Sequence, residues 1–307
     1  MALRKESPPF VLLAGDFKWD NPRAMKLLTW NVQWCRGIDG KVDPARIART
    51  IHGLGHFDVI CLQEVAVNFP GLDGNSEADQ VRELSSLLPG HSAHFGAGTD
   101  VADGKGGRSL FGNLILSRLP VAQVYRHLLP WPVDTAKPSM QRVAVEAVVR
   151  AAWGDTRIIT THLEYYSARQ RAAQVEALRN LHAQACEHAG SPRPSGDPGS
   201  PFAAIPRPAS AIITGDFNFR PEDPGHARMN ALFEGSIPRF FDAWRIAHPD
   251  TPHAPTVGVF ENSFADRPCC FDFIFVTPDI GGRVETVSVD GATQASDHQP
   301  VMLELRD

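Results

Sequence analysis

Cysteine is scarce in this sequence, and the five cysteines present include no C-x-x-C pair. A disulfide framework or a thiolate zinc site needs cysteines at suitable spacing, so we expect neither. Cys61 lies inside an apolar run, where a reduced, buried thiol is common. The cysteine pattern therefore favours free thiols and a cytoplasmic location.

The N-terminus lacks a long apolar run. Residues 10–14 form its only apolar stretch, which is too short for a secretion signal and far too short to span a bilayer. The chain also lacks an excess of basic residues, because 30 Lys and Arg face 35 Asp and Glu, a net charge of -5. Charge therefore gives no general attraction to nucleic acid or to anionic membranes.

Three common functional motifs are missing as well: the P-loop, the serine elbow and the glycine pattern of dinucleotide-binding proteins. The 307 residues are enough for one large domain with a sizeable core. We expect an N-terminal extension at residues 1–25 and a single domain at 26–307. Residues 190–208 are rich in Pro, Gly and Ser, which predicts a flexible insertion within that domain.

A short apolar stretch at residues 210–214 reads as a buried strand and leads into Gly215-Asp216-Phe217-Asn218. In extended geometry Asp216 and Asn218 project from the same side, which aims both at one site. The alternative is a turn in which the two side chains only cap the backbone. The other polar residues of the chain bear on this choice.

Several further apolar segments contain or end in a polar group. These are strands expected at 26–32 with Asn31, at 57–62 ending in Gln63-Glu64, at 157–164 with His162, at 271–276 with Asp272, and at 301–305 after Asp297-His298. Polar residues at strand ends converge on one rim of an α/β protein. Oxygen ligands with few carboxylates suit Mg²⁺ or Mn²⁺ better than zinc. Together with two histidines they fit attack of water on a phosphate ester.

The remaining pattern alternates helices with strands, an α/β arrangement. We expect helices at 44–54 after Asp43, after a capping box at 76–79, from Ser167 to about 185, at 225–233 and at 240–247. Further strands are expected at 110–117, 121–126 and 142–149, with a surface loop at 96–109. Alternation in the strand at 142–149 either carries Arg142 to a polar site or leaves it in solvent.

The chain from about Lys26 to Leu305 resembles the endonuclease/exonuclease/phosphatase superfamily of DNase I-like phosphoesterases. The resemblance rests on six motifs in the family's order: Thr29-Trp30-Asn31, Leu62-Gln63-Glu64, Thr161-His162-Leu163, Gly215-Asp216-Phe217-Asn218, Phe271-Asp272-Phe273-Ile274 and Ser296-Asp297-His298. It implies a four-layer α/β sandwich in which two mixed β-sheets pack face to face between helices.

The resemblance also implies a role for each motif. Glu64 would be the principal metal ligand, helped by Asn31 and Asp297, with Mg²⁺ or Mn²⁺ as the cofactor. Among the catalytic residues, Asp216 and Asn218 would position the water and the phosphate, His298 would pair with Asp272, and either Asp216 or His298 would take the proton. His162 and Arg142 would bind phosphate oxygens together with Asn218.

The expected function is a divalent-metal-dependent phosphoesterase, a phosphodiesterase or nuclease-type hydrolase whose partner is a phosphate-ester substrate such as nucleic acid. One alternative is a phosphatase or phospholipase C-type enzyme acting on a small or lipid head-group phosphate. Another is an inactive binding module with the same fold. No sequence feature indicates a protein partner or a transmembrane segment.

Overall fold

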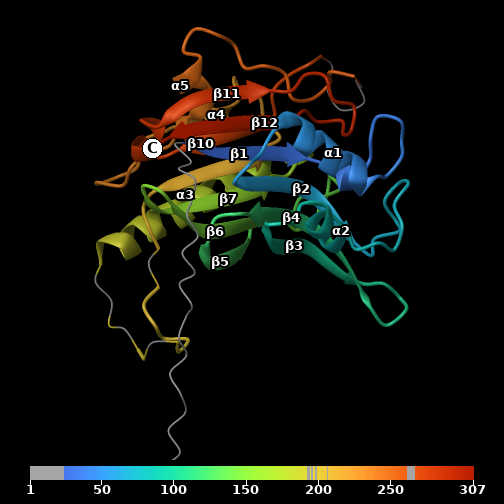
Figure 1. Cartoon of the computed structure of the whole chain (residues 1–307), viewed down its shortest axis with the longest axis horizontal. Helices are drawn as coiled ribbons and strands as arrows, with labels where there is room; N and C mark the ends of the chain where they lie inside the picture. Colours follow the sequence, from blue (N-terminus) through green and yellow to red (C-terminus); the bar gives the residue numbers. More distant parts are fainter. Residues whose placement is uncertain (1–23, 192–193, 195, 198, 206, 261–266) are drawn as a thin grey trace, which may run out of the picture.

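The computed structural model describes all residues except 1–23, 192–193, 195, 198, 206 and 261–266 (Figure 1). The expected N-terminal extension therefore lies almost wholly outside the described residues, and the expected insertion at 190–208 lies partly outside them. No helix in the described part of the chain has both the length and the apolar character needed to cross a bilayer.

Two six-stranded mixed sheets form the centre of the fold. The first sheet has the order β11 (Val284–Val289), β12 (Val301–Arg306), β1 (Ala24–Asn31), β2 (Val59–Val67), β4 (Arg108–Ser117), β3 (Ser92–Ala102). The second has the order β5 (Val121–Leu128), β6 (Val143–Ala151), β7 (Gly154–His162), β8 (Ala211–Asp216), β10 (Asp272–Val276), β9 (Phe241–Asp242). The pairs β1–β2 and β7–β8 are parallel, and all other neighbours are antiparallel.

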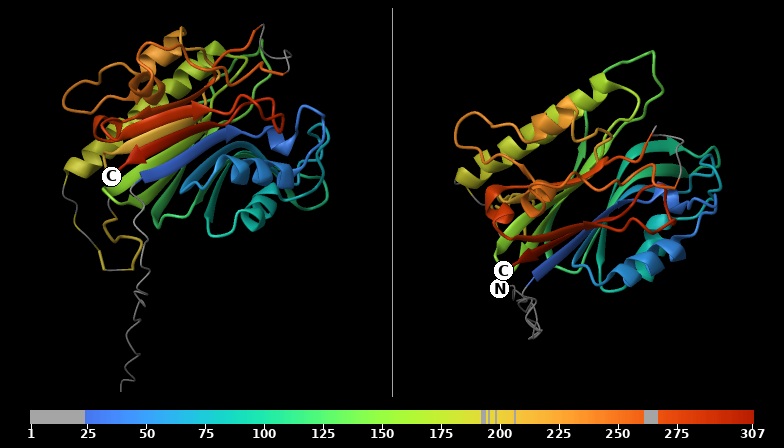
Figure 2. Two further views of the ribbon diagram at one scale, coloured as in Figure 1. Left: turned by 45° about the horizontal axis from the view of Figure 1, so that its top comes forward. Right: turned by 90° about the horizontal axis from the view of Figure 1, so that it is seen from above.

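Helices cover the outer faces of the sheets (Figure 2). They are α1 (Pro44–Leu54) and α2 (Gln80–Leu87) beside the first sheet and α3 (Ala168–Gly190) and α4 (Pro224–Met229) beside the second. The short α5 (Ala243–Ala247) and α6 (Pro278–Gly281) instead pack against the core between the sheets. The layers are thus helix, sheet, sheet, helix. The four-layer α/β sandwich predicted from the sequence is confirmed.

Strand alternation builds the core. Leu27 of β1 packs between the two sheets, whereas its neighbour Leu28 packs under α1 and α2. A third cluster, which includes Val175 of α3 and Ile213 of β8, lies between the second sheet and its helices. Because both faces of the central strands are buried, they read as nearly continuous apolar runs.

Local capping signals predict two helix starts correctly and one incorrectly. Asp43 accepts a hydrogen bond of 3.0 Å from the Arg46 amide, and Ser167 accepts one of 3.2 Å from the Gln170 amide, so both are N-caps. The expected capping box at 76–79 is wrong at its first residue. Ser76 instead closes a tight turn by accepting from Ala78, and Asp79 caps α2.

The surface loop expected at 96–109 is also wrong. Most of it belongs to β3 and β4, and only residues 103–107 lie between those strands. Two of the glycines that suggested a loop serve close packing instead, because a Cβ on Gly96 would collide with the Val145 side chain and one on Gly98 with the Gln141 carbonyl oxygen. The outer end of β3 is exposed, so its sequence lacks the apolar alternation that indicates a half-buried strand.

Other boundaries shift for tertiary reasons. β2 does not end at Gln63-Glu64 but continues to Val67 through a bulge between Leu62 and Val65. The helix expected at 240–247 starts only at Ala243, because Phe241 and Asp242 pair with β10. Strand β11, which no sequence pattern suggested, pairs with β12 at the edge of the first sheet.

Candidate active site

The strand ends meet at one rim of the sandwich. Asn31, His162 and Asp216 are the last residues of β1, β7 and β8. β10 runs antiparallel to β8, so its first residue, Asp272, lies directly beside Asp216. β12 likewise runs antiparallel to β1, which brings the segment preceding it, with His298, to the same rim.

Asp216 and Asn218 are held by a turn rather than by an extended strand. The strand ends at Asp216, and Asn218 has a φ of 52°, in the left-handed region. Asp216 Oδ1 accepts from the Asn218 amide at 2.9 Å, and Asn218 Nδ2 donates to the Leu163 carbonyl at 2.9 Å. The same-side extended geometry predicted from the sequence is therefore wrong, although both side chains still line the pocket.

Glu64 lies at the β2 bulge with a φ of 59°, which turns its side chain towards the rim. Asn31 Nδ2 donates to its Oε1 at 2.9 Å. Burial, and then the neighbouring Asp297 carboxylate, raise the pKa of Glu64 to about 7. The negative charge of Glu64 is thus poorly neutralised by its neighbours, and such a carboxylate is a good ligand for a cation.

His298 and Asp272 form a buried pair with 2.9 Å between Nδ1 and Oδ2. Burial by itself would lower the pKa of His298, but the Asp272 and Asp216 carboxylates outweigh it and raise that pKa well above its ordinary value. Burial also raises the pKa of Asp216 to about 6, although His298 acts in the opposite direction. The arrangement thus favours an imidazolium beside a carboxylate of raised basicity.

His162 and Arg142 form the opposite wall. His162 lies between the two acids, with Nδ1 3.7 Å from Glu64 Oε1 and Nε2 3.4 Å from Asp216 Oδ2. Burial and the positive charge of Arg142 lower the pKa of His162 well below its usual value, which favours the neutral imidazole. Arg142 is buried rather than in solvent; its Nε lies 3.3 Å from Glu164 Oε2, and its Nη1 has no hydrogen-bond partner in the part of the chain that the structure describes.

The sequence did not indicate several residues that line the site. Gln33 Nε2 donates to Asp297 Oδ2 at 2.8 Å, from a 3₁₀ turn, η1 (Gln33–Cys35), whose three residues have φ values of 45°, 44° and 63°. Consecutive left-handed non-glycine residues are strained and are set by tertiary contacts. The one available signal was proximity, because Gln33 follows the Asn31 motif, as Tyr165 and Tyr166 follow the His162 motif.

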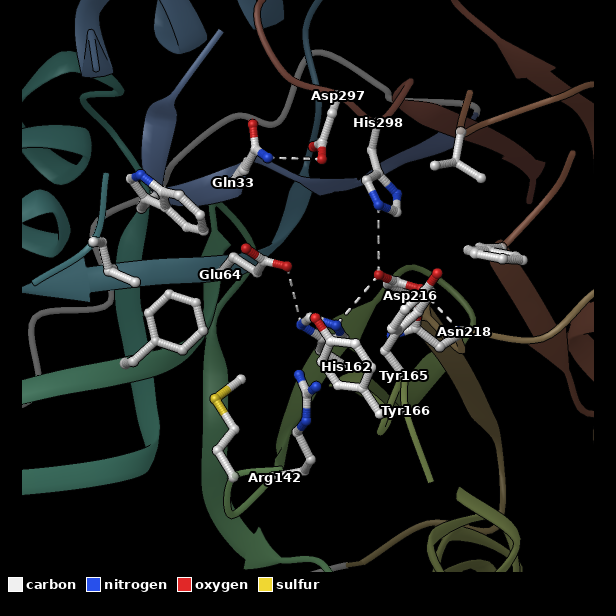
Figure 3. A pocket seen from close by; sticks show the side chains of 16 residues that line it. Gln33, Glu64, Arg142, His162, Tyr165, Tyr166, Asp216, Asn218, Asp297 and His298 are labelled. Carbon is white, nitrogen blue, oxygen red and sulfur yellow. Dashed lines mark hydrogen bonds and ion pairs between the residues drawn. The ribbon is translucent and has the colours of Figure 1, made fainter. Parts of the chain in front are cut away.

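These side chains surround a pocket of about 340 Å³ (Figure 3). Its polar side holds Gln33, Glu64, Arg142, His162, Asp216, Asn218, Asp297 and His298, and its other lining residues are Trp34, Leu72, Phe111, Met140, Tyr165, Tyr166, Val257 and Phe271. In the close-up view the labelled polar side chains project into one space from both sheets. Of the residues predicted as functional, Asn31 and Asp272 lie behind this wall.

The donors present fit a hard divalent cation. Glu64 and Asp297 offer carboxylate oxygens in the pocket, and Gln33 orients Asp297. Asn31 directs its amide nitrogen, not its oxygen, at Glu64, and its Oδ1 accepts from the Gln33 amide. In this orientation Asn31 positions Glu64, and its role as a direct ligand stays a prediction. Beside Glu64 and Asp297, the side chains of Asp216, Asp272 and His298 also bring ligand-type atoms together.

Comparison with solved structures gives relatives of the same fold. An endonuclease/exonuclease/phosphatase from Beutenbergia cavernae is 25% identical with a TM-score of 0.67, over 92% of this chain and 72% of that one. A mannosyl-6-phosphatase from Bacteroides thetaiotaomicron is 16% identical with a TM-score of 0.62, over 92% of this chain and 100% of that one. TDP2 from D. rerio, complexed with a single-strand DNA product, is 19% identical with a TM-score of 0.60, over 92% of this chain and 99% of that one.

No curated protein matches the sequence. The sequence profile of the endonuclease/exonuclease/phosphatase family, however, matches residues 28–298, which include every residue predicted for the site. Members of this family are hydrolases that act on phosphate esters, and they generally depend on divalent metals. Given this match, the four-layer fold and the rim of carboxylates and imidazoles, the chain belongs to the endonuclease/exonuclease/phosphatase family.

Proposed function

We propose that this protein is a Mg²⁺- or Mn²⁺-dependent phosphoesterase, of the phosphodiesterase or nuclease type. The observation that carries the proposal is the convergence of Glu64, Asp216 and Asp297 with His162 and His298 in one pocket. Carboxylates that hold a cation, next to donors for phosphate oxygens, are what hydrolysis of a phosphate ester requires.

Glu64 and Asp297 would hold the metal, with Asn31 and Gln33 fixing their orientation. When bound, the ion supplies neutralisation of the negative charge on the phosphoryl oxygens. The oxygen-only donor set favours Mg²⁺ or Mn²⁺ over zinc. The pKa of Glu64, about 7 without a cation, is expected to fall once a positive charge lies beside it.

The other residues act on the water and the phosphate. Asp216 accepts a proton from the attacking water as the new O–P bond forms and the P–O bond to the leaving group breaks, and the leaving oxygen departs as an alkoxide that takes a proton from solvent. Asn218 holds the water or the phosphate in place. The His298 imidazolium, kept charged by Asp272, donates to a phosphoryl oxygen. Neutral His162 and the unpartnered Nη1 of Arg142 donate to the remaining oxygens.

The substrate class has three candidates. TDP2, complexed with single-strand DNA, illustrates a nucleic-acid substrate on this fold, and the mannosyl-6-phosphatase illustrates a sugar phosphate. A phospholipase C-type reaction on a lipid head group would use the same site. The pocket volume of about 340 Å³ accommodates a phosphate with one small organic group in any of these cases.

The five free cysteines support a cytoplasmic location.

The test is hydrolysis of a substrate panel by the purified full-length chain, with Mg²⁺, with Mn²⁺ and with EDTA. The panel contains bis-p-nitrophenyl phosphate, p-nitrophenyl phosphate, single- and double-stranded DNA, RNA, mannose 6-phosphate, inositol phosphates and sphingomyelin. We expect turnover of at least one ester that EDTA abolishes and added metal restores. Absence of turnover across the panel in protein that binds Mn²⁺ would instead favour the binding-module alternative.

A further inference from the structure

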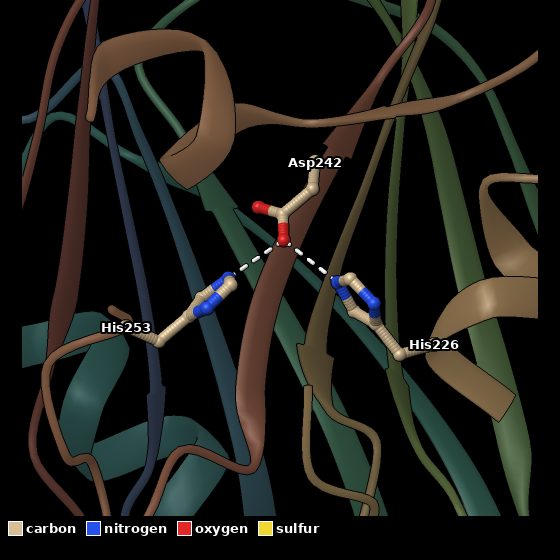
Figure 4. A group of neighbouring side chains, drawn as sticks. All are labelled: His226, Asp242 and His253. Carbon is tan, nitrogen blue, oxygen red and sulfur yellow. Dashed lines mark hydrogen bonds and ion pairs between the residues drawn. The ribbon is translucent and has the colours of Figure 1, made fainter. Parts of the chain in front are cut away.

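A second group of ligand-type side chains lies outside the active-site pocket. His226 of α4, Asp242 of β9 and His253 of the segment after α5 meet in the structure (Figure 4). Nε2 of His226 lies 2.7 Å from Asp242 Oδ2, and Nε2 of His253 lies 2.6 Å from the same oxygen. Figure 4 shows the two rings approaching this oxygen from opposite sides. The side chains are 13%, 3% and 4% exposed.

The surroundings hold the three groups in place. Asp242 Oδ1 accepts from the Trp244 amide at 2.9 Å, which leaves Oδ2 for the histidines. The Trp244 ring stacks on His253 at 5.8 Å between centroids, and the Phe273 ring lies 5.1 Å from His226 and 5.4 Å from His253. Such a rigid, apolar shell strengthens electrostatic interactions with a bound cation.

Hydrogen bonding within the group does not satisfy all of its polar atoms. Both imidazoles direct Nε2 at one carboxylate oxygen, so each ring must donate from that atom. The other nitrogen of His253, Nδ1, is buried and has no hydrogen-bond partner among the described residues. Metal binding through Nε2 would leave this nitrogen unpaired as well, so Nδ1 does not by itself distinguish a metal site from a hydrogen-bonded triad.

We propose that His226, Asp242 and His253 form a transition-metal site, with Zn²⁺ as its ion, separate from the active site. Two imidazole nitrogens and one carboxylate oxygen are a donor set typical of Zn²⁺ and unlike the oxygen donors of the pocket. Tetrahedral ligation at about 2.0–2.1 Å needs ligand atoms about 3.3 Å apart, so each Nε2–Oδ2 separation, 2.7 and 2.6 Å here, would lengthen by less than about 1 Å. Each ring then carries its proton on Nδ1 and binds through Nε2.

Space and access are present at the group. A small cavity of about 10 Å³ touches Asp242 and His253, close to the size needed for one water as the fourth ligand. A surface depression of about 300 Å³, lined by His226, Asp242 and Arg245 among others, gives an ion a route from solvent. A ligand set with an access route and room for a fourth ligand meets the requirements of a metal site.

The position of the group suggests a structural role for the ion. His253 lies three residues before Thr256, whose Oγ1 accepts from the Phe271 amide at 3.0 Å and from the Asp272 amide at 3.2 Å. The Thr256 carbonyl accepts from the Gln299 amide at 2.7 Å. A metal at His253 would therefore fasten, to α4 and β9, the segment that supports the start of β10 and the chain next to His298.

The test is Co²⁺ titration of metal-free protein, followed by visible absorption, with melting temperature measured in parallel with and without Zn²⁺. Glu64→Gln weakens the active-site ligands, so a Co²⁺ signal that survives in this variant comes from elsewhere. We expect one equivalent of Co²⁺ with the intense visible bands of low-coordinate cobalt in Glu64→Gln, and a higher Tm with Zn²⁺. His226→Gln and His253→Gln should each lower the affinity at least about a hundredfold.

His248→Gln is the matched control, because His248 binds the Val287 carbonyl and lies outside the group. Asp242→Asn keeps an oxygen for the helix cap and serves if a histidine variant does not fold. Absence of the bands in Glu64→Gln, or equal Co²⁺ affinity in His253→Gln and His248→Gln, would overturn the proposal and leave a hydrogen-bonded triad. Neither readout uses turnover, so the result is independent of the proposed phosphoesterase activity.

Discussion

Asn31 Nδ2 donates a hydrogen bond of 3.0 Å to Asp216 Oδ2, and this contact joins the ends of central strands in opposite sheets. The same nitrogen donates to Glu64 Oε1 at 2.9 Å. One amide therefore links the residue proposed to hold the metal to the residue proposed to take the proton. Because all three are in contact, a change at any one of them alters the others' environment.

Glu64→Gln is expected to weaken Mn²⁺ binding at least tenfold, because it removes a charged ligand while keeping the size of the side chain. The melting temperature of metal-free protein should stay the same or rise, since the Glu64 carboxylate is buried near Asp297 and its pKa is raised to about 7. Calorimetric titration and thermal unfolding at pH 8 measure the two quantities. Glu285→Gln, on the exposed face of β11, is the control. A large loss of stability would show that Glu64 is mainly structural.

His298→Ala should lower kcat by about 10²- to 10⁴-fold, because it removes the charged donor to the phosphoryl group. Asp272→Asn should lower kcat less, since the imidazole stays in place but loses the carboxylate that raises the pKa of His298. Steady-state kinetics on the best substrate of the panel give both values, with the exposed His52→Ala as a control. Equal kcat in His298→Ala and His52→Ala would exclude a catalytic role.

Arg142→Lys should reduce kcat/KM by about tenfold or more, although it keeps the positive charge. The guanidinium both contacts Glu164 through Nε and leaves Nη1 for substrate, and the single ammonium of lysine cannot make this pair of contacts. Arg169→Lys, on the exposed surface of α3, provides the comparison in the same assay. If both variants kept full kcat/KM, Arg142 would not bind phosphate.

Glu146→Gln tests a buried ionic network away from the pocket. Burial would raise the pKa of Glu146, but hydrogen bonds from His127 and Arg207 lower it to about 2. A carboxylate whose pKa is lowered by folding stabilises the folded state at pH values above its unfolded-state pKa. Here this contribution is about 3 kcal/mol, and it is lost as the pH falls towards 2. In urea unfolding, wild type should therefore lose its advantage over Glu146→Gln between about pH 5 and pH 2. A constant difference across that range would contradict this.

Gly215→Ala should destabilise the protein by more than about 3 kcal/mol, because the new Cβ would collide with the Thr161 carbonyl oxygen of the neighbouring strand. The backbone at Gly215, with a φ of 135°, also disfavours any side chain. Urea unfolding measures the loss, and Gly53→Ala in α1, where nothing lies near the added Cβ, should be neutral or stabilising. Equal stability of the two variants would contradict the close strand contact.

Features that depend on neighbouring residues in the chain were predictable from the sequence. The start of α1 at Asp43-Pro44 follows from capping chemistry, and the buried strand before Asp216 follows from its apolar composition. The bulge that turns Glu64 and the left-handed turn that places Gln33 were not predictable in this way. Both are unfavourable locally and persist only because distant residues hold them.

The sequence alone indicated which side chains we propose to carry the chemistry and that each lies at or near one end of an apolar strand. Only the tertiary structure decided that they share a pocket, because Asn31 and Asp216 are 185 residues apart and meet through packing of one sheet on the other. The antiparallel direction of β10 then places Asp272 at the start of its strand beside the end of β8. Strand direction and sheet packing depend on long-range contacts, which a local pattern does not encode.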